Sequence, residues 1–358
     1  IDPEADPIAA QNANITLDGS VVLQMGSRKE TITSPSEDNL ASSLIRLTSP
    51  GPRTVYFLTG EGERDPSASG QNGFSQAKAA LEGKSYTVKT LNLIATPKVP
   101  DDATIIVIAG PTKPLNSNEV KLLSDYMDKG GGLVVMEEPT PVTDFGNASD
   151  PLADYLASTW NIQLANDFII DRTVNPPTVA AANEYGQSPI TDKIKTVVSL
   201  FPTARSVSVK DGSANATVQP VLLVKTASQS WGETNFTDLA ANKANFDQGQ
   251  DVAGPLSVAA AAQMTDKNSR VVVIGDSDFA SDNAYGQYAN GDFFINSVDW
   301  AARQDKLINL TQKAQTQRLL LPPQSYVMNL ILLGSVFVIP GAVVVSGVLV
   351  WLQRRRRG

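Results

Sequence analysis

Hydrophobic runs and amphipathic segments alternate through the middle of the chain. Runs rich in β-branched residues predict buried strands, and segments with apolar residues at helical spacing predict helices between them. The predicted strands are Thr54–Thr59, Tyr86–Leu91, Thr104–Ala109, Gly132–Glu137 and Arg270–Gly275. The predicted helices are Gly73–Glu82, Asn116–Lys129, Pro151–Thr159 and Asp292–Arg303. This alternation predicts an α/β fold in which helices flank a mostly parallel sheet.

Two regions depart from the alternation. Residues 1–50 form a lead-in segment before the first predicted strand. Residues 175–254 are rich in Asn, Gln, Ser and Thr and contain one clear strand, Pro220–Val224, so they predict an irregular β-rich insertion or subdomain. The α/β domain is therefore expected to consist of residues 51–174 and 255–312.

The most distinctive segment lies near the C-terminus, after a linker at residues 313–325. The chain is uncharged from Tyr326 to Leu352, and a helix of that length, at ~1.5 Å per residue, exceeds the ~30 Å of a bilayer's hydrocarbon core. Tyr326 and Trp351 stand at its ends, where aromatic rings favour the headgroup layer. Residues 326–352 thus predict a single transmembrane helix, with a kink expected at Pro340-Gly341.

A basic tail at residues 353–358 sets the expected orientation. Its four consecutive arginines, Arg354, Arg355, Arg356 and Arg357, are typical of a cytoplasmic flank, which places the main domain outside the cytoplasm and the protein in the cell membrane, in contact with lipid. The chain begins Ile1-Asp2-Pro3 with no visible export signal. We therefore expect that the chain is the C-terminal part of a longer precursor, or that an upstream signal or membrane segment was removed.

Composition narrows the chemistry that is available. The chain has 29 basic and 37 acidic residues, a formal net charge of -8, and neither histidine nor cysteine. Without these two residue types there is no cysteine nucleophile, Ser-His-Asp triad or zinc site of the usual ligands, and no cofactor is predicted. The acidic balance disfavours nucleic acid as a partner. No phosphate-binding loop of the Gly-x-x-x-x-Gly-Lys-Ser/Thr type occurs.

Acidic and glycine residues follow several predicted strands. They are the candidate ligand-binding residues Gly60, Glu61, Gly62, Glu63, Glu137, Asp276 and Asp278. The carboxyl ends of parallel strands share one edge of a sheet, where α/β proteins bind ligands. Two interpretations remain open: a cluster that binds a cation or sugar hydroxyls or performs acid-base chemistry, and ordinary turn residues that are solvated separately.

The run that begins at Asp276 has the acidic spacing of a calcium loop in part. It carries Ser281 where such a loop needs glycine and Gln287 where it needs glutamate. No metal site is predicted from it.

Several segments, taken in order along the chain, carry a family resemblance. They are Asp2-Pro3-Glu4, Val55–Glu63, Ile108–Leu115, Tyr126–Gly131 and Val273–Phe279. Together they resemble the auxiliary component of ABC-type transport systems related to the gliding-motility protein GldG. The resemblance implies an extracytoplasmic domain similar to class I glutamine amidotransferase-like domains, without a nucleophilic cysteine, held beside a membrane complex.

The chain departs from this family at one turn. Family members often carry Gly-His-Gly-Glu there, and in this chain Glu61 replaces the histidine, which leaves Gly60, Gly62 and Glu63 as matching positions. Any ligand role assumed for the turn in the family does not carry over to Glu61 directly.

The expected function is that of a non-catalytic accessory subunit of an ABC-type transport system. Its expected partners are the permease and ATPase subunits, and an envelope polymer or a second copy of the chain. One alternative is a hydrolase of cell-envelope glycans that uses Glu61, Glu63, Glu137, Asp276 and Asp278. Another is a structural or binding module of an envelope assembly that has no transporter.

Overall fold

The computed structural model describes residues 19–32, 35–48, 53–71, 73–210, 217–305 and 333–356, together with Ile8, Ala10 and Ile15. The chain divides into two compact units, Ile1–Lys313 and Ala314–Gly358, which are described separately. The predictions at the linker 313–325, at Tyr326 and at Arg357 lie outside the described residues, as does the Asp2-Pro3-Glu4 motif.

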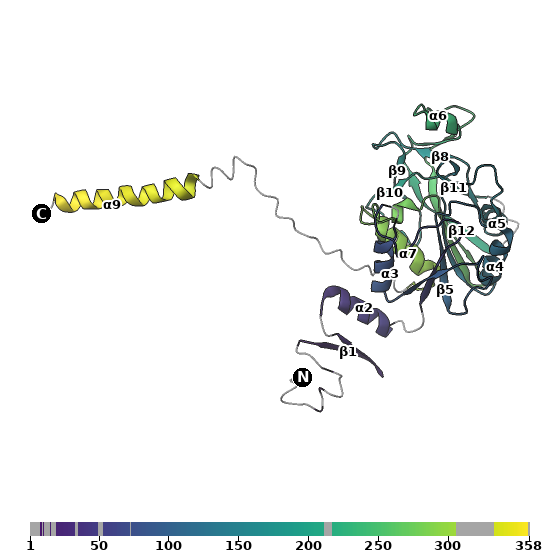
Figure 1. Cartoon of the computed structure of the whole chain (residues 1–358), viewed down its shortest axis with the longest axis horizontal. Coiled ribbons are helices and arrows are strands. Elements are labelled where there is room, and N and C mark those ends of the chain that lie inside the picture. Colours follow the sequence, from purple (N-terminus) through teal and green to yellow (C-terminus); the bar gives the residue numbers. More distant parts are fainter. Residues whose placement is uncertain are drawn as a thin grey trace. The chain divides into compact units, whose positions relative to one another are not determined.

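A nine-stranded sheet forms the centre of the first unit, in the order β10-β9-β12-β15-β16-β6-β5-β3-β4 (Figure 1). One half is parallel and consists of β4 (Thr87–Leu91), β3 (Thr54–Leu58), β5 (Ala103–Ala109), β6 (Gly132–Met136) and β16 (Ser269–Ile274). These are the five strands that the hydrophobic pattern predicts, each within two residues of its expected ends. The side chains of β3, β5, β6 and β16 are mostly buried on both faces, as parallel strands between helices require, whereas those of the edge strand β4 are mostly exposed.

The other half of the sheet is antiparallel, so the prediction of a mostly parallel sheet is wrong. It consists of β15 (Ser257–Met264), β12 (Val218–Thr226), β9 (Val179–Tyr185) and β10 (Ser199–Pro202). A short turn with Asn268 at φ 54° joins β15 to β16, and so short a connection permits only antiparallel pairing. The interior of β15 is the run Ala259–Ala262, whose weak β-propensity hides the strand from sequence analysis. Residues 175–254 thus contribute three strands to the main sheet.

Helices cover both faces of the sheet, as the sequence predicts. They are α3 (Ser75–Gly83), α4 (Ser117–Met127), α5 (Pro151–Thr159) and α7 (Asn290–Ala301). Helices α3 and α7 pack on one face in a core that includes Val134 and Met136 of β6, and α4 and α5 pack on the other with Leu133 and Val135 (Figure 1). The alternation of side chains along each strand therefore divides the core into two layers.

Smaller elements complete the first unit. The lead-in segment forms a hairpin of β1 (Val21–Met25) and β2 (Arg28–Ile32), followed by α2 (Glu37–Thr48). Two small sheets pair β7 (Ile162–Leu164) with β11 (Val207–Val209), and β13 (Trp231–Glu233) with β8 (Phe168–Ile170) and β14 (Val252–Ala253). The short helices are α6 (Phe236–Ala240), η1 (Thr140–Val142) and η2 (Asp278–Ala280).

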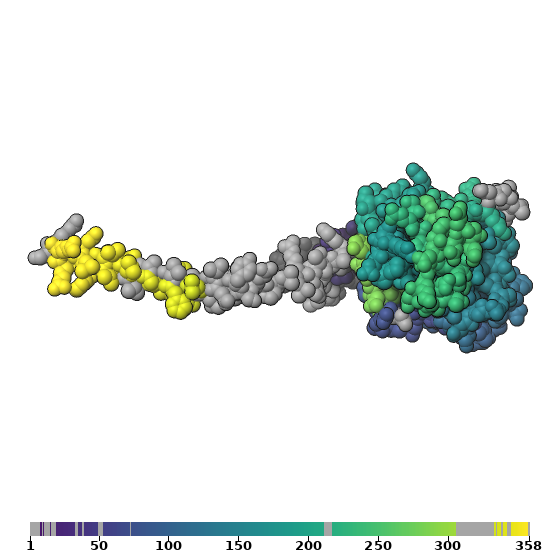
Figure 2. Space-filling model, turned by 90° about the horizontal axis from the view of Figure 1, so that it is seen from above, coloured from purple at the N-terminus to yellow at the C-terminus, as the bar shows by residue number. Residues whose placement is uncertain are grey.

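The described part of the second unit, residues 333–356, is helical, and its described apolar side chains, such as Phe337, Val345 and Leu349, are exposed (Figure 2). A wide π-helical turn, η3 (Gly334–Val338), leads into α9 (Ile339–Arg355). The turn ends two residues before Pro340, which has no backbone N–H to donate to the preceding turn. The stretch Ser335–Arg355 is long and apolar enough to cross a membrane, by length and composition. It continues three residues past the predicted end at Leu352, because arginine is a good helix former.

Candidate functional site

The structure divides the predicted ligand-binding residues among three places. Gly60, Glu61, Gly62 and Glu63 lie in the loop after β3, Glu137 follows β6, and Asp276 and Asp278 follow β16. Each carboxylate finds different neighbours.

The first group consists of Glu61, Glu63 and Glu119, and its backbone is fixed by glycine. Gly62 has φ 87°, and a Cβ atom there would overlap the side chain of Thr112, so only glycine fits. The backbone N–H groups of Thr112 and Lys113 each donate to the carbonyl of Glu61 at 2.9 Å. The loop is thereby held against the end of β5.

Burial and neighbouring carboxylates change the pKa of Glu61. Burial, followed by repulsion from the carboxylates of Glu63 and Glu119, raises the pKa of Glu61 to about 8. Glu119 is buried because it completes the capping box of α4, where its Oε2 accepts a hydrogen bond from the backbone N–H of Asn116 at 3.1 Å. At pH 7 the Glu61 carboxyl is therefore mostly protonated.

The second group is a buried ion pair between Glu137 and Arg205. The guanidinium Nη1 lies 3.0 Å from Glu137 Oε1, and the two side chains are 0% and 7% exposed for Glu137 and Arg205, respectively. Arg205 Nε also donates to the carbonyl of Ala165 at 2.6 Å. Burial raises the pKa of Glu137, and Arg205 opposes that rise. This pair ties the end of β6 to the segment before β11, which is a structural role.

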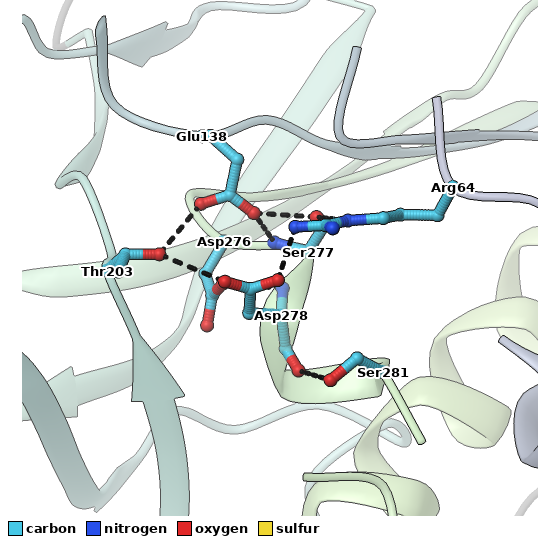
Figure 3. Close-up of polar contacts among 7 residues, drawn as sticks. All are labelled: Arg64, Glu138, Thr203, Asp276, Ser277, Asp278 and Ser281. Carbon is cyan, nitrogen blue, oxygen red and sulfur yellow. Dashed lines mark hydrogen bonds and ion pairs between the residues drawn. The ribbon is translucent and has the colours of Figure 1, made fainter. Parts of the chain in front are cut away.

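The third group gathers Glu138, Asp276 and Asp278, and we refer to it as the acid cluster (Figure 3). One carboxylate oxygen from each residue lies within 4.8 Å of the other two. The residues come together because β6 and β16 are parallel neighbours, so the chain segments that follow them leave the sheet at the same edge. In the described part of the chain, this is the set of acidic side chains close enough to share one metal ion.

Hydrogen bonds hold most of the acid cluster in place. The backbone N–H and the hydroxyl of Ser277 donate to Glu138 Oε1 at 2.7 and 2.6 Å. The Thr203 hydroxyl lies 3.1 Å from Glu138 Oε2 and 3.4 Å from Asp278 Oδ2. Arg64 forms an ion pair with Asp278 from the opposite side (Figure 3).

Asp276 is the exception within the acid cluster. Its Oδ1 accepts the backbone N–H of Asp278 at 2.7 Å, whereas its Oδ2 is buried with no hydrogen-bond partner among the described residues. Burial raises the pKa of Asp276 well above its usual range, and the negative charges of Glu138 and Asp278 add to that effect. Burial, followed by repulsion from Asp278, raises the pKa of Glu138 to about 7.

Two pockets adjoin the acid cluster and share Asp278 as a lining residue. One, of about 300 Å³, is lined by Glu138, Thr203 and Arg64 among others. The other, of about 480 Å³, combines apolar residues such as Leu200 with the polar residues Gln71, Asn175, Asn283, Gln287 and Tyr288. The acid cluster is therefore accessible from solvent through Glu138 and Asp278, although Asp276 is fully buried.

The structure thus brings Asp276 and Asp278 together and adds Glu138, Arg64, Thr203 and Ser277, which were not among the predicted site residues. The alternation of side chains along β6 is the signal that identifies Glu138. Counting in steps of two along the chain, Glu138 follows Val134 and Met136, whereas Glu137 follows Leu133 and Val135, which belong to the other core layer. Nothing in the sequence indicates that Arg64 lies beside Asp278.

Comparison with known proteins places this domain in a family. The profile described as an ABC-type uncharacterized transport system, the auxiliary component, matches residues 52–297. The chain belongs to this family. The match confirms the ABC transport auxiliary resemblance predicted from the motifs, and it includes all three groups of carboxylates. No curated protein sequence matches the chain.

Solved structures show what the fold of this ABC transport auxiliary is similar to. The N-terminal domain of mmIFT52 has 16% sequence identity and a TM-score of 0.50, over 69% of this chain and 97% of that one. A ThuA-like protein from Bacteroides uniformis has 14% identity and a TM-score of 0.42, over 71% and 93% of the two chains. At these identities the first similarity concerns the fold alone.

Proposed function

We propose that this chain is a non-catalytic accessory subunit of an ABC-type transport system, anchored in the cell membrane with its α/β domain outside the cytoplasm. The observation that carries the proposal is one chain holding both the auxiliary-family domain, matched at residues 52–297, and the apolar helix Ser335–Arg355. This chain has no phosphate-binding loop of the Gly-x-x-x-x-Gly-Lys-Ser/Thr type, so ATP would be hydrolysed by a partner subunit.

The charge at the end of the helix supports the proposed orientation. Arg354, Arg355 and Arg356 follow the apolar stretch, and the guanidinium of Arg355 lies 5.4 Å from the centre of the Trp351 ring. An aromatic ring beside fixed cations suits the headgroup layer on the cytoplasmic side. In the sequence, Tyr326 marks the predicted outer end of the membrane-spanning segment, and Arg357 is the last arginine at its cytoplasmic end.

The arrangement of the carboxylates favours binding over glycan hydrolysis. The five acidic residues of the hydrolase alternative lie in three groups, and Glu137 is held by Arg205. Glu138 and Asp278 do face one pocket, but the Asp278 carboxylate is paired with Arg64 and the Glu138 carboxylate accepts two hydrogen bonds from Ser277. A glycoside hydrolase needs two carboxyl groups on either side of a bound sugar, one that donates a proton and one that acts as base or nucleophile.

The partner-binding surface that we propose is the pocket of about 480 Å³ beside Asp278. Its amide side chains and the exposed Tyr288 present hydrogen-bond donors and acceptors without a dominant charge. Such a lining suits a partner polypeptide or a polyhydroxylated envelope polymer. We also propose a fold similar to class I glutamine amidotransferase-like domains, supported by the five parallel strands with helices on both faces.

Copurification tests the proposal. The full chain, extracted from native membranes in a mild detergent and captured by an affinity tag, is expected to bring down an ABC permease and an ATPase in fixed ratio. A matched chain ending before Ser335 should lose that association if the helix is the anchor. Recovery of the full chain alone, after chemical cross-linking in intact membranes, would contradict the accessory-subunit function.

A further inference from the structure

We propose that Glu138, Asp276 and Asp278 form a binding site for a hard divalent cation of the Ca²⁺ or Mg²⁺ kind. The proposal goes beyond the accessory function and does not depend on it, because it rests on the geometry of the α/β domain alone. The three carboxylates supply one oxygen each within 4.8 Å of the others, a spacing that lets a single ion contact all three.

The charge of the acid cluster is unbalanced without a cation. Three carboxylates stand against one guanidinium, that of Arg64, which pairs with Asp278. Fully ionised, the group carries a formal charge of about -2, and a divalent ion brings it to zero. Protons are the competing way to neutralise the charge, so the cation and protons compete for the same oxygens.

The buried oxygen of Asp276 is an independent observation that points to a ligand. Asp276 is 0% exposed, and its Oδ2 has no hydrogen-bond partner in the described part of the chain. Buried polar atoms in folded proteins are almost always satisfied. The carboxylate of Asp276 lies beside that of Asp278 and below that of Glu138 (Figure 3). A cation bound by Glu138 and Asp278 would therefore lie close enough for Asp276 to bind it as well.

The donor chemistry selects the class of ion. All nearby donors are oxygens, namely the carboxylates and the hydroxyls of Thr203 and Ser277, and the chain has no histidine or cysteine to favour a softer metal. Glu138 and Asp278 line the pocket of about 300 Å³. That pocket gives an ion an entry path and space for the water ligands that Ca²⁺ and Mg²⁺ retain.

The group of Glu61, Glu63 and Glu119 provides a contrast. It also has buried carboxylate oxygens without partners, but none of the three residues lines either pocket beside the acid cluster, and Glu119 is engaged in the capping box of α4. We therefore use Glu61→Gln as the matched control, since it removes a buried carboxylate without touching the acid cluster.

The test is a cation titration of the purified full chain in detergent. Isothermal calorimetry and thermal unfolding with CaCl₂, MgCl₂ and MnCl₂ at pH 8 are expected to give one bound ion per chain and a raised Tm. Asp276→Asn and Glu138→Gln should each weaken binding by at least about tenfold. Glu61→Gln should bind as the wild type does.

Two results would overturn the site. One is the absence of both binding heat and a Tm shift for all three ions at 10 mM. The other is unchanged affinity in Asp276→Asn and Glu138→Gln. Circular dichroism of the ion-free variants establishes that they are folded, and the EPR signal of bound Mn²⁺ measures occupancy independently of stability.

Discussion

Glu137 and Glu138 are adjacent in the chain, yet their carboxylates lie in different groups at the end of β6. Glu137 pairs with Arg205 at 3.0 Å, whereas Glu138 accepts two hydrogen bonds from Ser277. The first contact joins β6 to the segment before β11, whereas Glu138 lines a pocket of about 300 Å³. One residue is therefore structural and its neighbour belongs to the candidate site.

The Glu137–Arg205 pair predicts a large loss of stability when one partner is removed. Glu137→Ala leaves a buried guanidinium without its counter-charge, which we expect to lower the free energy of unfolding by about 3–5 kcal/mol. Urea denaturation of the tagged protein measures this change in the free energy of unfolding. The control is Asp125→Ala in the exposed pair with Lys121, where the change should stay within about 0.5 kcal/mol. Equal effects would show that the buried pair has no special role.

The raised pKa of Glu61 predicts that the free energy of unfolding falls as pH rises. Its folded-state pKa of about 8 lies above the ordinary value of 4.5, so the folded protein binds more protons than the unfolded chain between these two pH values, and stability declines across that window. Glu61→Gln stays neutral and should be at least about 1 kcal/mol more stable than the wild type at pH 8, since one pKa unit corresponds to ~1.36 kcal/mol.

Denaturation curves from pH 4.5 to pH 8.5 check this. The pKa of Glu138, about 7, adds a loss in the same direction, so the double variant with Glu138→Gln should have the flattest profile. A Glu61→Gln profile that is parallel to the wild type would contradict the assignment.

Gly62 predicts a steric requirement at the turn after β3. Ala at this position combines φ 87° with overlap of Thr112 Oγ1, and we expect a loss of about 1–3 kcal/mol in unfolding free energy. Gly70→Ala separates the two causes, because Gly70 has φ 103° and open space around its Cα. The clash contributes only if Gly62→Ala is the more destabilising of the two.

Membrane topology is testable because the chain contains no cysteine. Ser69→Cys lies in the α/β unit and Gln353→Cys lies at the end of α9, and both positions are exposed. A membrane-impermeant maleimide applied to intact cells should label Ser69→Cys and should label Gln353→Cys only after permeabilisation. Labelling of both without permeabilisation, or the reverse pattern, would contradict the proposed orientation.

Local signals were sufficient for part of the fold. The five parallel strands are rich in β-branched, aromatic and other apolar residues. Asn116 with Glu119 marks the start of α4 by a capping box that forms as expected. The antiparallel half was harder because Ala259–Ala262 gives β15 little β-propensity. Its place in the sheet depends on burial between β12 and β16, which is a tertiary effect.

The sequence by itself determined the family, the α/β layering, the apolar helix and the exclusion of histidine and cysteine chemistry, because composition, periodicity and motif order are properties of the chain. Only the tertiary structure decided which carboxylates meet. Strand order brought Glu138 beside Asp276 and Asp278 and placed Glu61 and Glu137 elsewhere. The distance between residues from separate strands depends on how the strands pair, and that pairing is fixed by burial of the whole sheet.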